Sequence, residues 1–290
     1  MGTENLNDKQ VRAKILAEAL PYIQQYKDQI VVVKYGGNAM VNENLKNSVM
    51  RDIVLLELIG MKVVLVHGGG PEISGMLQRV GKESVFIDGL RYTDEETAEI
   101  VCMVLAGKVN KSLVNLLESY GGKAVGLCGI DGHMLKCVPE NPKLGYVGKV
   151  TEISTKLLTD LLDRGYIPVV STVGYDDEGH IYNVNADTAA AAVAGALKAR
   201  SLILMTDTAG VLRDRNDPSS LIEKIYVSDI PSYIKEGIIS GGMIPKIECC
   251  KEGIRRGVGK VFIIDGRVEH SILVEILSDK GIGTMFVSGD

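Results

Sequence analysis

The sequence has little of what nucleic-acid-binding and zinc-binding proteins usually carry. Tryptophan is absent, phenylalanine occurs only three times, and the formal net charge is −5. Neither an aromatic platform for stacking bases nor a basic patch for nucleic-acid phosphates is therefore expected. The four histidines are scattered along the chain and show no zinc-ligand spacing. We predict no nucleic-acid partner and no metal site built from the protein's own side chains.

The cysteines and the apolar segments exclude further classes. The five cysteines are an odd number without a C-x-x-C pair, and the adjacent Cys249 and Cys250 are typical of helix packing. The first residues are polar and acidic, so no signal peptide is expected. No apolar stretch is expected to reach the roughly 20 residues that a membrane helix requires. Together these absences predict a reduced, cytoplasmic protein with no membrane partner.

Two β-branched runs lead directly into glycines, and each carries one polar residue at the junction. Residues 30–37 read Ile-Val-Val-Val-Lys-Tyr-Gly-Gly, and residues 63–71 read Val-Val-Leu-Val-His-Gly-Gly-Gly-Pro. Glycines after a buried strand let backbone amides approach an anion closely. Lys34 adds a charge at the first junction, and a lysine in a buried strand is costly unless it meets an anion. The pair indicates phosphate chemistry, whereas His67 is expected to cap a strand end and not to act as a base.

Around these runs the apolar spacing alternates between the periods of strands and helices. Strands are expected over 123–127, 133–138, 146–150, 166–170, 201–205 and 261–264, and helices over 42–59, 94–120, 157–164, 186–197, 228–236 and 243–256. Thr93 is the expected N-cap of the helix 94–120. Strands that alternate with helices predict a mostly parallel sheet covered on both faces. The polar turn at 174–179 is the expected boundary between two lobes.

Three further segments carry polar residues that catalysis could use. Residues 183–187 (Asn-Val-Asn-Ala-Asp) lead into an alanine-rich helix; they suit N-caps, but alternate positions of an extended segment also face one side. Lys246 follows a glycine pair in a first helical turn, where a cation opposes the helix dipole. Two lysines that converge on one phosphoryl group would stabilise the charge on its oxygens. Arg91 is either a surface arginine or a bidentate clamp for a carboxylate.

Six motifs together resemble the amino acid kinase family in their order and spacing, over nearly the whole chain. They are Lys34-x-Gly-Gly, His67-Gly-Gly-Gly-Pro, Gly89-Leu-Arg91, Asn183-x-Asn-x-Asp187, Thr206-Asp-x-x-Gly210-Val and Gly241-Gly-Met-x-Pro-Lys246. Within the family, the chain is most similar to the members that phosphorylate the γ-carboxylate of N-acetyl-L-glutamate with ATP, in arginine biosynthesis. The resemblance implies an α/β fold, a three-layer α/β/α sandwich around a mostly parallel sheet, with an extra kinked N-terminal helix.

The resemblance also implies a role for each matching residue. Lys34 and Lys246 would stabilise the transition state, and Asp187 would hold both lysines. The residues implied for the acetylglutamate site are Gly69, Gly70, Arg91 and Asn183, with Arg91 on the α-carboxylate. The residues implied for the transferring phosphate and ATP are Gly36, Gly37, Thr206, Asp207, Gly210 and Val211. Tyr92 stands where the family more often has an aliphatic residue.

The implied reaction needs no general base, because a γ-carboxylate with a pKa of about 4.3 is already ionised at neutral pH. Mg²⁺ would enter with ATP, since no carboxylate cluster marks a metal cage. The implied division is an oligomerisation helix (1–28), a lobe for the acceptor and for dimerisation (29–174) and a lobe for ATP (175–290).

The N-terminal 28 residues have helical spacing before any strand exists to cover them. The apolar positions are Val11, Ile15, Leu16, Leu20 and Ile23, and Pro21 should kink the helix. The helix either folds back on its own domain or forms an arm that packs on another subunit. Arginine-inhibited members of the family carry a similar helix, which implies a homohexamer, a trimer of dimers. The segment 270–284 also resembles their arginine site, which here would include His270, Glu275, Gly281 and Gly283.

Other readings of the chain stay open. Another member of the same family would act on aspartate, unacetylated glutamate, carbamate or a nucleoside monophosphate, but Arg91 and Asn183 favour an acylated amino acid. A non-catalytic arginine-sensing protein is disfavoured by the presence of both lysines and Asp187. A dinucleotide-binding oxidoreductase is excluded because neither glycine turn reads G-x-G-x-x-G.

Overall fold

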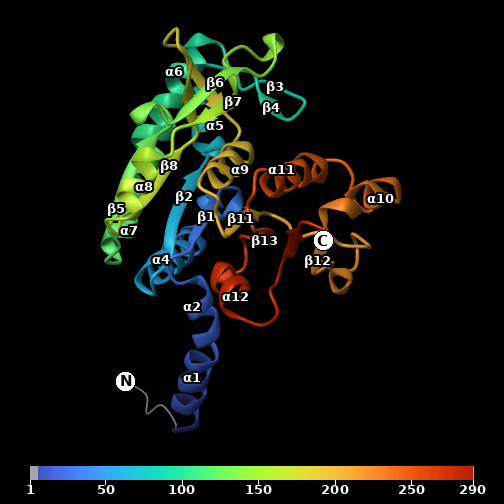
Figure 1. Ribbon diagram of the computed structural model, residues 1–290. Helices are drawn as coiled ribbons and strands as arrows, with labels where there is room; N and C mark the ends of the chain where they lie inside the picture. The colour runs from blue at the N-terminus through green and yellow to red at the C-terminus, as the bar shows by residue number, and fades with distance from the viewer. Residues whose placement is uncertain (1–5, 290) are drawn as a thin grey trace.

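A sheet of eight strands forms the centre of the computed structural model, which describes residues 6–289 (Figure 1). In spatial order the strands are β12 (Lys224–Tyr226), β14 (Thr284–Val287), β13 (Lys260–Asp265), β11 (Ser201–Thr206), β1 (Ile30–Tyr35), β2 (Lys62–His67), β8 (Ile167–Ser171) and β5 (Ala124–Cys128). Neighbours in this sheet are parallel except for the pair β13 and β14. The prediction of a mostly parallel sheet is confirmed.

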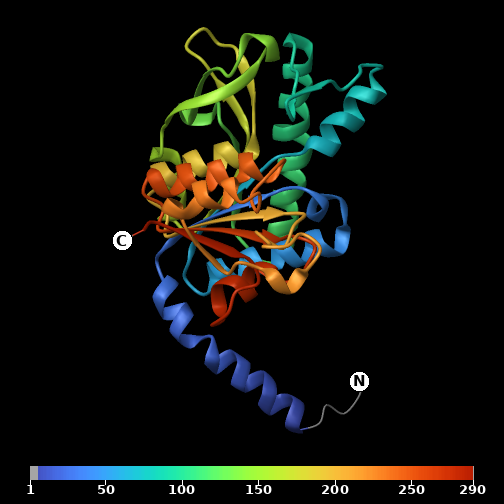
Figure 2. The same cartoon turned by 90° about the vertical axis from the view of Figure 1, so that its right-hand side faces the viewer.

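Helices cover both faces of the sheet, which lies between them in Figure 2. One face packs against α4 (Glu43–Leu58), α7 (Asn110–Ser119) and α12 (Ser271–Leu277), and the other against α8 (Lys156–Leu162), α9 (Ala186–Ala196) and α11 (Met243–Arg255). On β1, Val31 and Val33 belong to the first core and Val32 to the second. Because successive side chains point to opposite faces, a strand buried on both sides must be apolar throughout. The predicted three-layer sandwich is thus the observed one.

A smaller sheet and a hairpin lie at the top of the molecule in Figure 1. The sheet closes into a small barrel of β6 (Leu135–Pro139), β7 (Val147–Ile153), β9 (Val173–Tyr175) and β10 (Ile181–Val184), and the hairpin pairs β3 (Phe86–Ile87) with β4 (Leu90–Arg91). The remaining short helices are α3 (Asn38–Val41), α5 (Gly70–Arg79), α10 (Ile230–Lys235), η2 (Asp131–His133), η3 (Pro142–Leu144), η4 (Pro218–Ser220) and η5 (Val227–Asp229). The carboxyl ends of β1, β2, β8 and β11 share one edge of the central sheet, where α/β proteins place their ligands.

The long helical stretch 95–119 differs from its prediction in two ways. It consists of α6 (Glu95–Cys102), a π-helical segment η1 (Met103–Val109) and α7. Its N-cap is Asp94, which accepts a hydrogen bond from Thr97 N at 2.8 Å, whereas the predicted cap Thr93 donates to the Arg91 carbonyl. A carboxylate accepts from a free helical N–H more strongly than a hydroxyl, and it also favours the positive helix end.

The same stretch corrects the expectation about apolar length. By length and composition alone, Glu95–Ser119 is sufficient to cross a membrane, so the expectation that no stretch reaches that length was wrong. Its side chains Leu105, Leu113 and Leu117 are buried in the first core, however. The helix therefore packs inside the fold, as core helices of globular proteins do.

The N-terminal pattern forms two helices, α1 (Leu6–Glu18) and α2 (Leu20–Tyr26), that meet at Ala19. Pro21 lies in the first turn of α2, where its missing N–H costs nothing. Figures 1 and 2 show α1 extending away from the body instead of folding back on it. The apolar side chains Val11, Ile15, Leu16 and Leu20 are each more than half exposed.

Candidate active site

Two lysines and one aspartate meet at the carboxyl edge of the central sheet. Lys34 comes from β1, Asp187 from the first turn of α9 and Lys246 from the first turn of α11. Lys34 Nζ lies 2.9 Å from Asp187 Oδ1, and Lys246 Nζ lies 3.4 Å from Oδ2. Burial by itself would raise the pKa of Asp187, but the two ammonium groups lower it below the ordinary value. The carboxylate is therefore ionised at neutral pH and is shared by two cations, as the resemblance implied.

The local sequence explains why these three groups meet. Asn185 caps α9 by accepting hydrogen bonds from the backbone N–H groups of Asp187 and Thr188. The cap fixes the first turn and so the direction of the aspartate. Ala189 to Ala194 are buried without exception, and their small side chains allow α9 to pack closely on the sheet and on α11. Close packing of these two helices brings Lys246 within reach of the carboxylate.

The turn after β1 favours glycine at both of its positions. A Cβ on Gly36 would lie 2.9 Å from Lys34 Nζ, and a Cβ on Gly37 would lie 2.7 Å from Asp207 Oδ1. Gly37 also has φ +68°, which other residues rarely adopt. The turn therefore lets the backbone pass close to the Lys34 ammonium, an arrangement that suits a phosphoryl group.

On one side of the three charges is a cavity of about 190 Å³, called the acceptor cavity because the resemblance implies that the acceptor binds there. Its lining contains the predicted residues Gly69, Gly70, Arg91 and Asn183, and also Phe86, Leu105, Asn185 and Ala186. Arg91 is buried and donates to Ser84 Oγ (2.8 Å), Ser74 Oγ (2.8 Å) and the Gly70 carbonyl (3.0 Å). No carboxylate among the described residues pairs with it, so its charge remains available to a ligand.

On the other side is a cavity of about 410 Å³, the nucleotide-side cavity. Its lining contains Gly210, Val211 and Lys246, together with Met243 of the same motif as Lys246 and with Arg215 and Ile238, which no motif singled out. Thr206 and Asp207 do not line it. Thr206 instead bonds with its hydroxyl inside the turn that follows β11, where it contacts Thr208.

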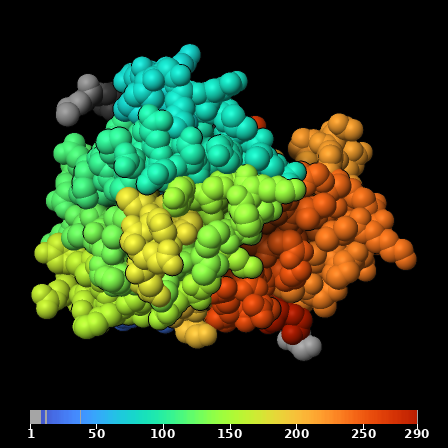
Figure 3. Space-filling view, turned by 90° about the horizontal axis from the view of Figure 1, so that it is seen from above, coloured from blue at the N-terminus to red at the C-terminus, as the bar shows by residue number. Residues whose placement is uncertain are grey.

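The geometry joins the two cavities through the three charges. Ala186, next to Asp187, lines the acceptor cavity, whereas Lys246 lines the nucleotide-side cavity. Seen from above, the first half of the chain and its orange C-terminal part abut along one boundary (Figure 3). The shared carboxylate of Asp187 thus lies next to a lining residue of each cavity.

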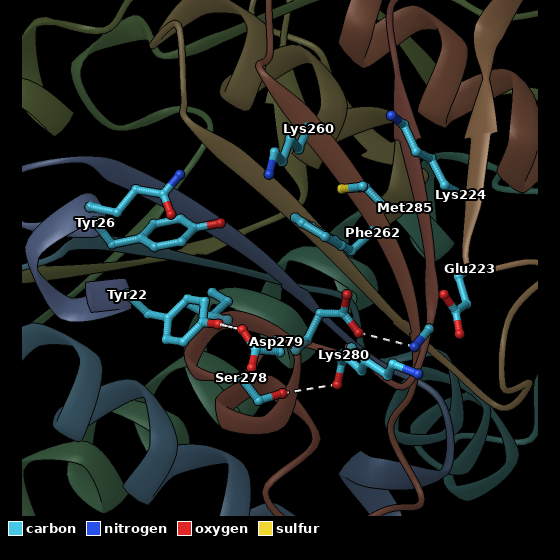
Figure 4. A pocket seen from close by; sticks show the side chains of 15 residues that line it. Tyr22, Tyr26, Glu223, Lys224, Lys260, Phe262, Ser278, Asp279, Lys280 and Met285 are labelled. Carbon is cyan, nitrogen blue, oxygen red and sulfur yellow. Dashed lines mark hydrogen bonds between the residues drawn. The ribbon is translucent and has the colours of Figure 1, made fainter. Parts of the chain in front are cut away.

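A third cavity of about 320 Å³ lies apart from these two, between α2, α12 and the β13–β14 edge (Figure 4). Three of the four residues predicted for an arginine site line it: Glu275, Gly281 and Gly283. Glu275 accepts hydrogen bonds from the N–H groups of Ile282 and Gly283, and burial raises its pKa. His270 lies elsewhere: its Nδ1 is 2.6 Å from Asp52 Oδ1, so it joins α12 to α4.

Comparison with known proteins gives the family. The model of the amino acid kinase family matches residues 29–265. The chain belongs to the amino acid kinase family. It is similar to the acetylglutamate kinase of Brachyspira hyodysenteriae, with 55% identity over 285 residues, 98% of this chain and 99% of that protein. The acetylglutamate kinase of Clostridium kluyveri is 55% identical over 275 residues, 94% of this chain and 97% of that protein.

Among solved structures, the fold is similar to N-acetylglutamate synthase from Neisseria gonorrhoeae in complex with coenzyme A and N-acetyl-glutamate. The TM-score is 0.83 with 25% sequence identity over 96% of this chain. This kinase-family chain spans only 64% of that synthase's length. Giardia carbamate kinase shares the fold at a TM-score of 0.65 and 17% identity.

Proposed function

We propose that the chain transfers the γ-phosphoryl group of ATP to the γ-carboxylate of N-acetyl-L-glutamate, the second step of arginine biosynthesis. The observation that carries this proposal is the Lys34–Asp187–Lys246 arrangement between two cavities, one of which is lined by a buried arginine that pairs with no carboxylate among the described residues. Relatives of the same length and about half the same sequence are named for this activity, and the similar synthase structure holds the same acylated amino acid.

The mechanism follows from charge. The acceptor carboxylate is ionised at neutral pH, so one of its oxygens attacks the γ-phosphorus in line without a general base, while the bond from that phosphorus to the β,γ-bridging oxygen breaks and ADP leaves. Lys34 and Lys246 neutralise the charge that develops on the phosphoryl oxygens, and the amides after β1 add hydrogen bonds. Asp187 holds the two ammonium groups in place before substrate arrives. Arg91 receives the α-carboxylate and thereby fixes the distance from the acceptor to the phosphorus.

Mg²⁺ fits this site as a companion of ATP. Asp187 is already shared by two lysines, so the described residues around the phosphoryl path offer few oxygen ligands for a metal. When bound with ATP, Mg²⁺ would neutralise charge on the phosphates. Asp176, Glu178 and His180 come within 4.8 Å of one another, but they lie on an exposed loop between β9 and β10.

The two halves of the chain take different substrates in this proposal. Residues 29–174 bind the acceptor and form the dimer, and residues 175–290 bind ATP. The segment from β10 to the start of α9 crosses between them, because β10 pairs with β7 while Asn185 and Ala186 line the acceptor cavity. We also propose a soluble, cytoplasmic protein, since the core takes up the apolar side of the helix 95–119.

The third cavity is proposed to bind arginine as an inhibitor. It combines the carboxylates of Glu223, Glu275 and Asp279 with the ammonium groups of Lys224, Lys260 and Lys280 (Figure 4). Opposite charges in one cavity suit a ligand with a guanidinium at one end and a carboxylate at the other. The hydroxyl of Tyr22 in α2 bonds to Asp279, so the cavity touches the N-terminal helices. Arginine should inhibit the intact enzyme, and Glu275→Gln should weaken inhibition without lowering uninhibited turnover.

The exposed apolar side of α1 is proposed to join subunits into a hexamer, a trimer of dimers. Deletion of residues 1–25 should leave dimers that still turn over. Light scattering measures the oligomeric state of the intact chain, and dimers would refute the proposed role of the helix.

The proposed activity is tested by a hydroxamate assay with ATP and a panel of acceptors. Acetylglutamate should exceed aspartate, glutamate and carbamate in kcat/KM. Lys34→Ala and Lys246→Ala should each abolish most turnover, whereas Lys62→Ala, which removes a surface ion pair with Asp163, should not. Preference for another acceptor would indicate a different kinase of the family. Arginine binding without phosphorylation of any acceptor would indicate a sensor.

A further inference from the structure

His67 is completely buried at the end of β2, directly before the glycine loop of the acceptor cavity. Its Nδ1 lies 2.8 Å from the Gly68 carbonyl oxygen, and its Nε2 lies 3.1 Å from Asn110 Nδ2. A carbonyl oxygen can only accept, so Nδ1 carries the proton and donates it to Gly68. Nε2 is then free of hydrogen and accepts from the Asn110 amide. The contacts thus define one neutral tautomer.

Asn110 ties this histidine to the neighbouring strands. Its Nδ2 also lies 2.8 Å from the Val169 carbonyl in β8 and 3.2 Å from the Leu127 carbonyl in β5. Its Oδ1 accepts from Lys111 Nζ, which donates as well to the Gly126 carbonyl. Buried polar side chains are costly unless their partners are complete. Here the two hydrogens of the Asn110 amide are shared among three acceptors, and the network runs from the glycine loop across two strands of the sheet.

The π-helical segment η1 places the same helix against the loop. A Cβ on Gly69 would lie 2.7 Å from Leu105 Cδ2 and 3.3 Å from Val109 Cγ2. Both side chains belong to η1, and Asn110 follows it directly. A π turn inserts an extra residue into the helix and is frequent at functional sites. One helical segment therefore supports the loop by packing and holds the histidine by a hydrogen bond.

The direction of the Gly68 carbonyl determines the direction of the next amide. In a trans peptide the C=O and the following N–H point to opposite sides. The carbonyl of Gly68 points at the buried imidazole, so the N–H of Gly69 points away from it, and Gly68 to Gly70 line the acceptor cavity on that side. The histidine itself does not line the cavity.

We propose that His67 and Asn110 are positioning residues that lock the Gly68–Gly69 peptide so that its N–H faces the acceptor. This inference rests on the proposed function, in which the loop receives the γ-carboxylate of the acceptor. It assigns His67 neither a base nor a proton-transfer role.

Paired substitutions separate the two hydrogen bonds of the imidazole. An Asn side chain places its amide near the position of Nδ1. His67→Asn therefore keeps a donor for the Gly68 carbonyl and loses the hydrogen bond with Asn110. A Gln side chain reaches the position of Nε2. His67→Gln therefore keeps the hydrogen bond with Asn110 and loses the one to the Gly68 carbonyl. We expect His67→Gln to raise KM for acetylglutamate at least tenfold, with KM for ATP within twofold. His67→Asn keeps the bond to Gly68 and loses only its support from Asn110, so it should raise KM for acetylglutamate by a smaller factor.

Ser171→Ala is the matched control. Ser171 is the partner of His67 in the β2–β8 register, is equally buried, and bonds through its hydroxyl to the Leu127 carbonyl. Its removal tests the effect of losing a buried polar group at the same depth and should leave both KM values unchanged. Equal KM for the acceptor in wild type and in folded His67→Gln would overturn the proposal, as would an equal increase in Ser171→Ala.

A second measurement needs no variant and no substrate. ¹⁵N NMR of the histidine side chains in the intact protein should show His67 as the neutral Nδ1–H tautomer at neutral pH. The Nε2–H tautomer or an imidazolium would overturn the inference. Wild-type protein that fails to phosphorylate acetylglutamate would refute the proposed function, and the tautomer would still decide the role of His67.

Discussion

The shared carboxylate of Asp187 makes a quantitative prediction. The ion pairs at 2.9 Å and 3.4 Å correspond to Coulomb energies of about 6 and about 5 kcal/mol at an effective dielectric constant of about 20. Desolvation of the three groups offsets most of this attraction. Loss of one partner from a buried pair typically costs about 3–5 kcal/mol, because the remaining charge stays uncompensated. Asp187→Asn keeps the shape of the side chain and removes only its charge.

In Asp187→Asn the two ammonium groups repel each other without a counter-ion. We expect them to turn toward solvent before ATP binds, so that the transition state loses the alignment that the aspartate provided. A loss of about 3–5 kcal/mol corresponds to a decrease in kcat of roughly 100- to 5,000-fold. The pKa of Asp187 is lowered in the folded protein, so its contribution is complete above about pH 4 and is lost only as pH falls further. The acid limb of the rate profile above pH 5 should therefore not come from this residue.

The assay is initial-rate hydroxamate formation with saturating ATP and acetylglutamate. Asp163→Asn serves as control, because it removes a carboxylate from the exposed pair with Lys62, where a contribution of about 0–1 kcal/mol is usual. Circular dichroism should show that both variants are folded. A folded Asp187→Asn enzyme with kcat within threefold of wild type would refute the view that the carboxylate organises the lysines.

Three further outcomes are expected. Arg91→Lys keeps a charge but loses the forked bonds to two serines and the stacking on the Phe86 ring, at 4.7 Å, so KM for the acceptor should rise roughly 10- to 100-fold with kcat nearly unchanged in steady-state kinetics. Gly37→Ala should lower Tm and turnover together in thermal melts and rate assays, because φ +68° costs a side chain about 1–3 kcal/mol. Burial lowers the pKa of His67 to about 4, so its neutral form stabilises the fold above about pH 6.5, and up to about 3 kcal/mol is lost as pH falls to 4. Asp52, whose pKa is raised to about 6, changes the free energy of unfolding with pH in the opposite direction. The contribution of His67 should therefore be isolated by comparing urea unfolding of wild type and His67→Asn across this pH range.

The sequence was sufficient for the layers of the fold because each layer has a local signature. The run from Val31 to Val33 has no polar alternation, which predicts a strand covered on both faces, and Asn185, in a segment that suits N-caps, marks a helix start that the structure contains. Very short strands such as β3 and β9 were not predicted, because two or three residues carry no periodicity. The π segment was also missed, since one wide turn leaves the apolar spacing of a helix nearly intact.

The candidate site shows the same limit at longer range. The residue types at Lys34, Asp187 and Lys246 suggested phosphate chemistry, but no local pattern places one carboxylate between the two lysines: the resemblance implied that arrangement, and the fold contains it. His67 looked like a strand cap because its partner, Asn110, comes from a helix that no local pattern connects to it. His270 was placed at an arginine site on resemblance, yet its side chain pairs with Asp52 on another helix. Side-chain partners from distant segments are decided by packing and cannot be found by spacing.

The charges of the site explain why one acidic residue is needed among so many positive groups. The helices α5, α9 and α11 all begin at the site, with Gly70, Ala186 and Met243, and each contributes the positive end of its dipole. The positive charge of Lys34, Lys246 and three helix N-termini attracts ATP and a dicarboxylate. While the site is empty, however, these positive groups repel one another. Asp187 holds the lysines at the distance that an incoming phosphoryl group requires, so little reorganisation remains for the reaction itself. A neutral residue there would leave the attraction for substrate intact and would remove the alignment, which is why the loss should appear in kcat more than in KM.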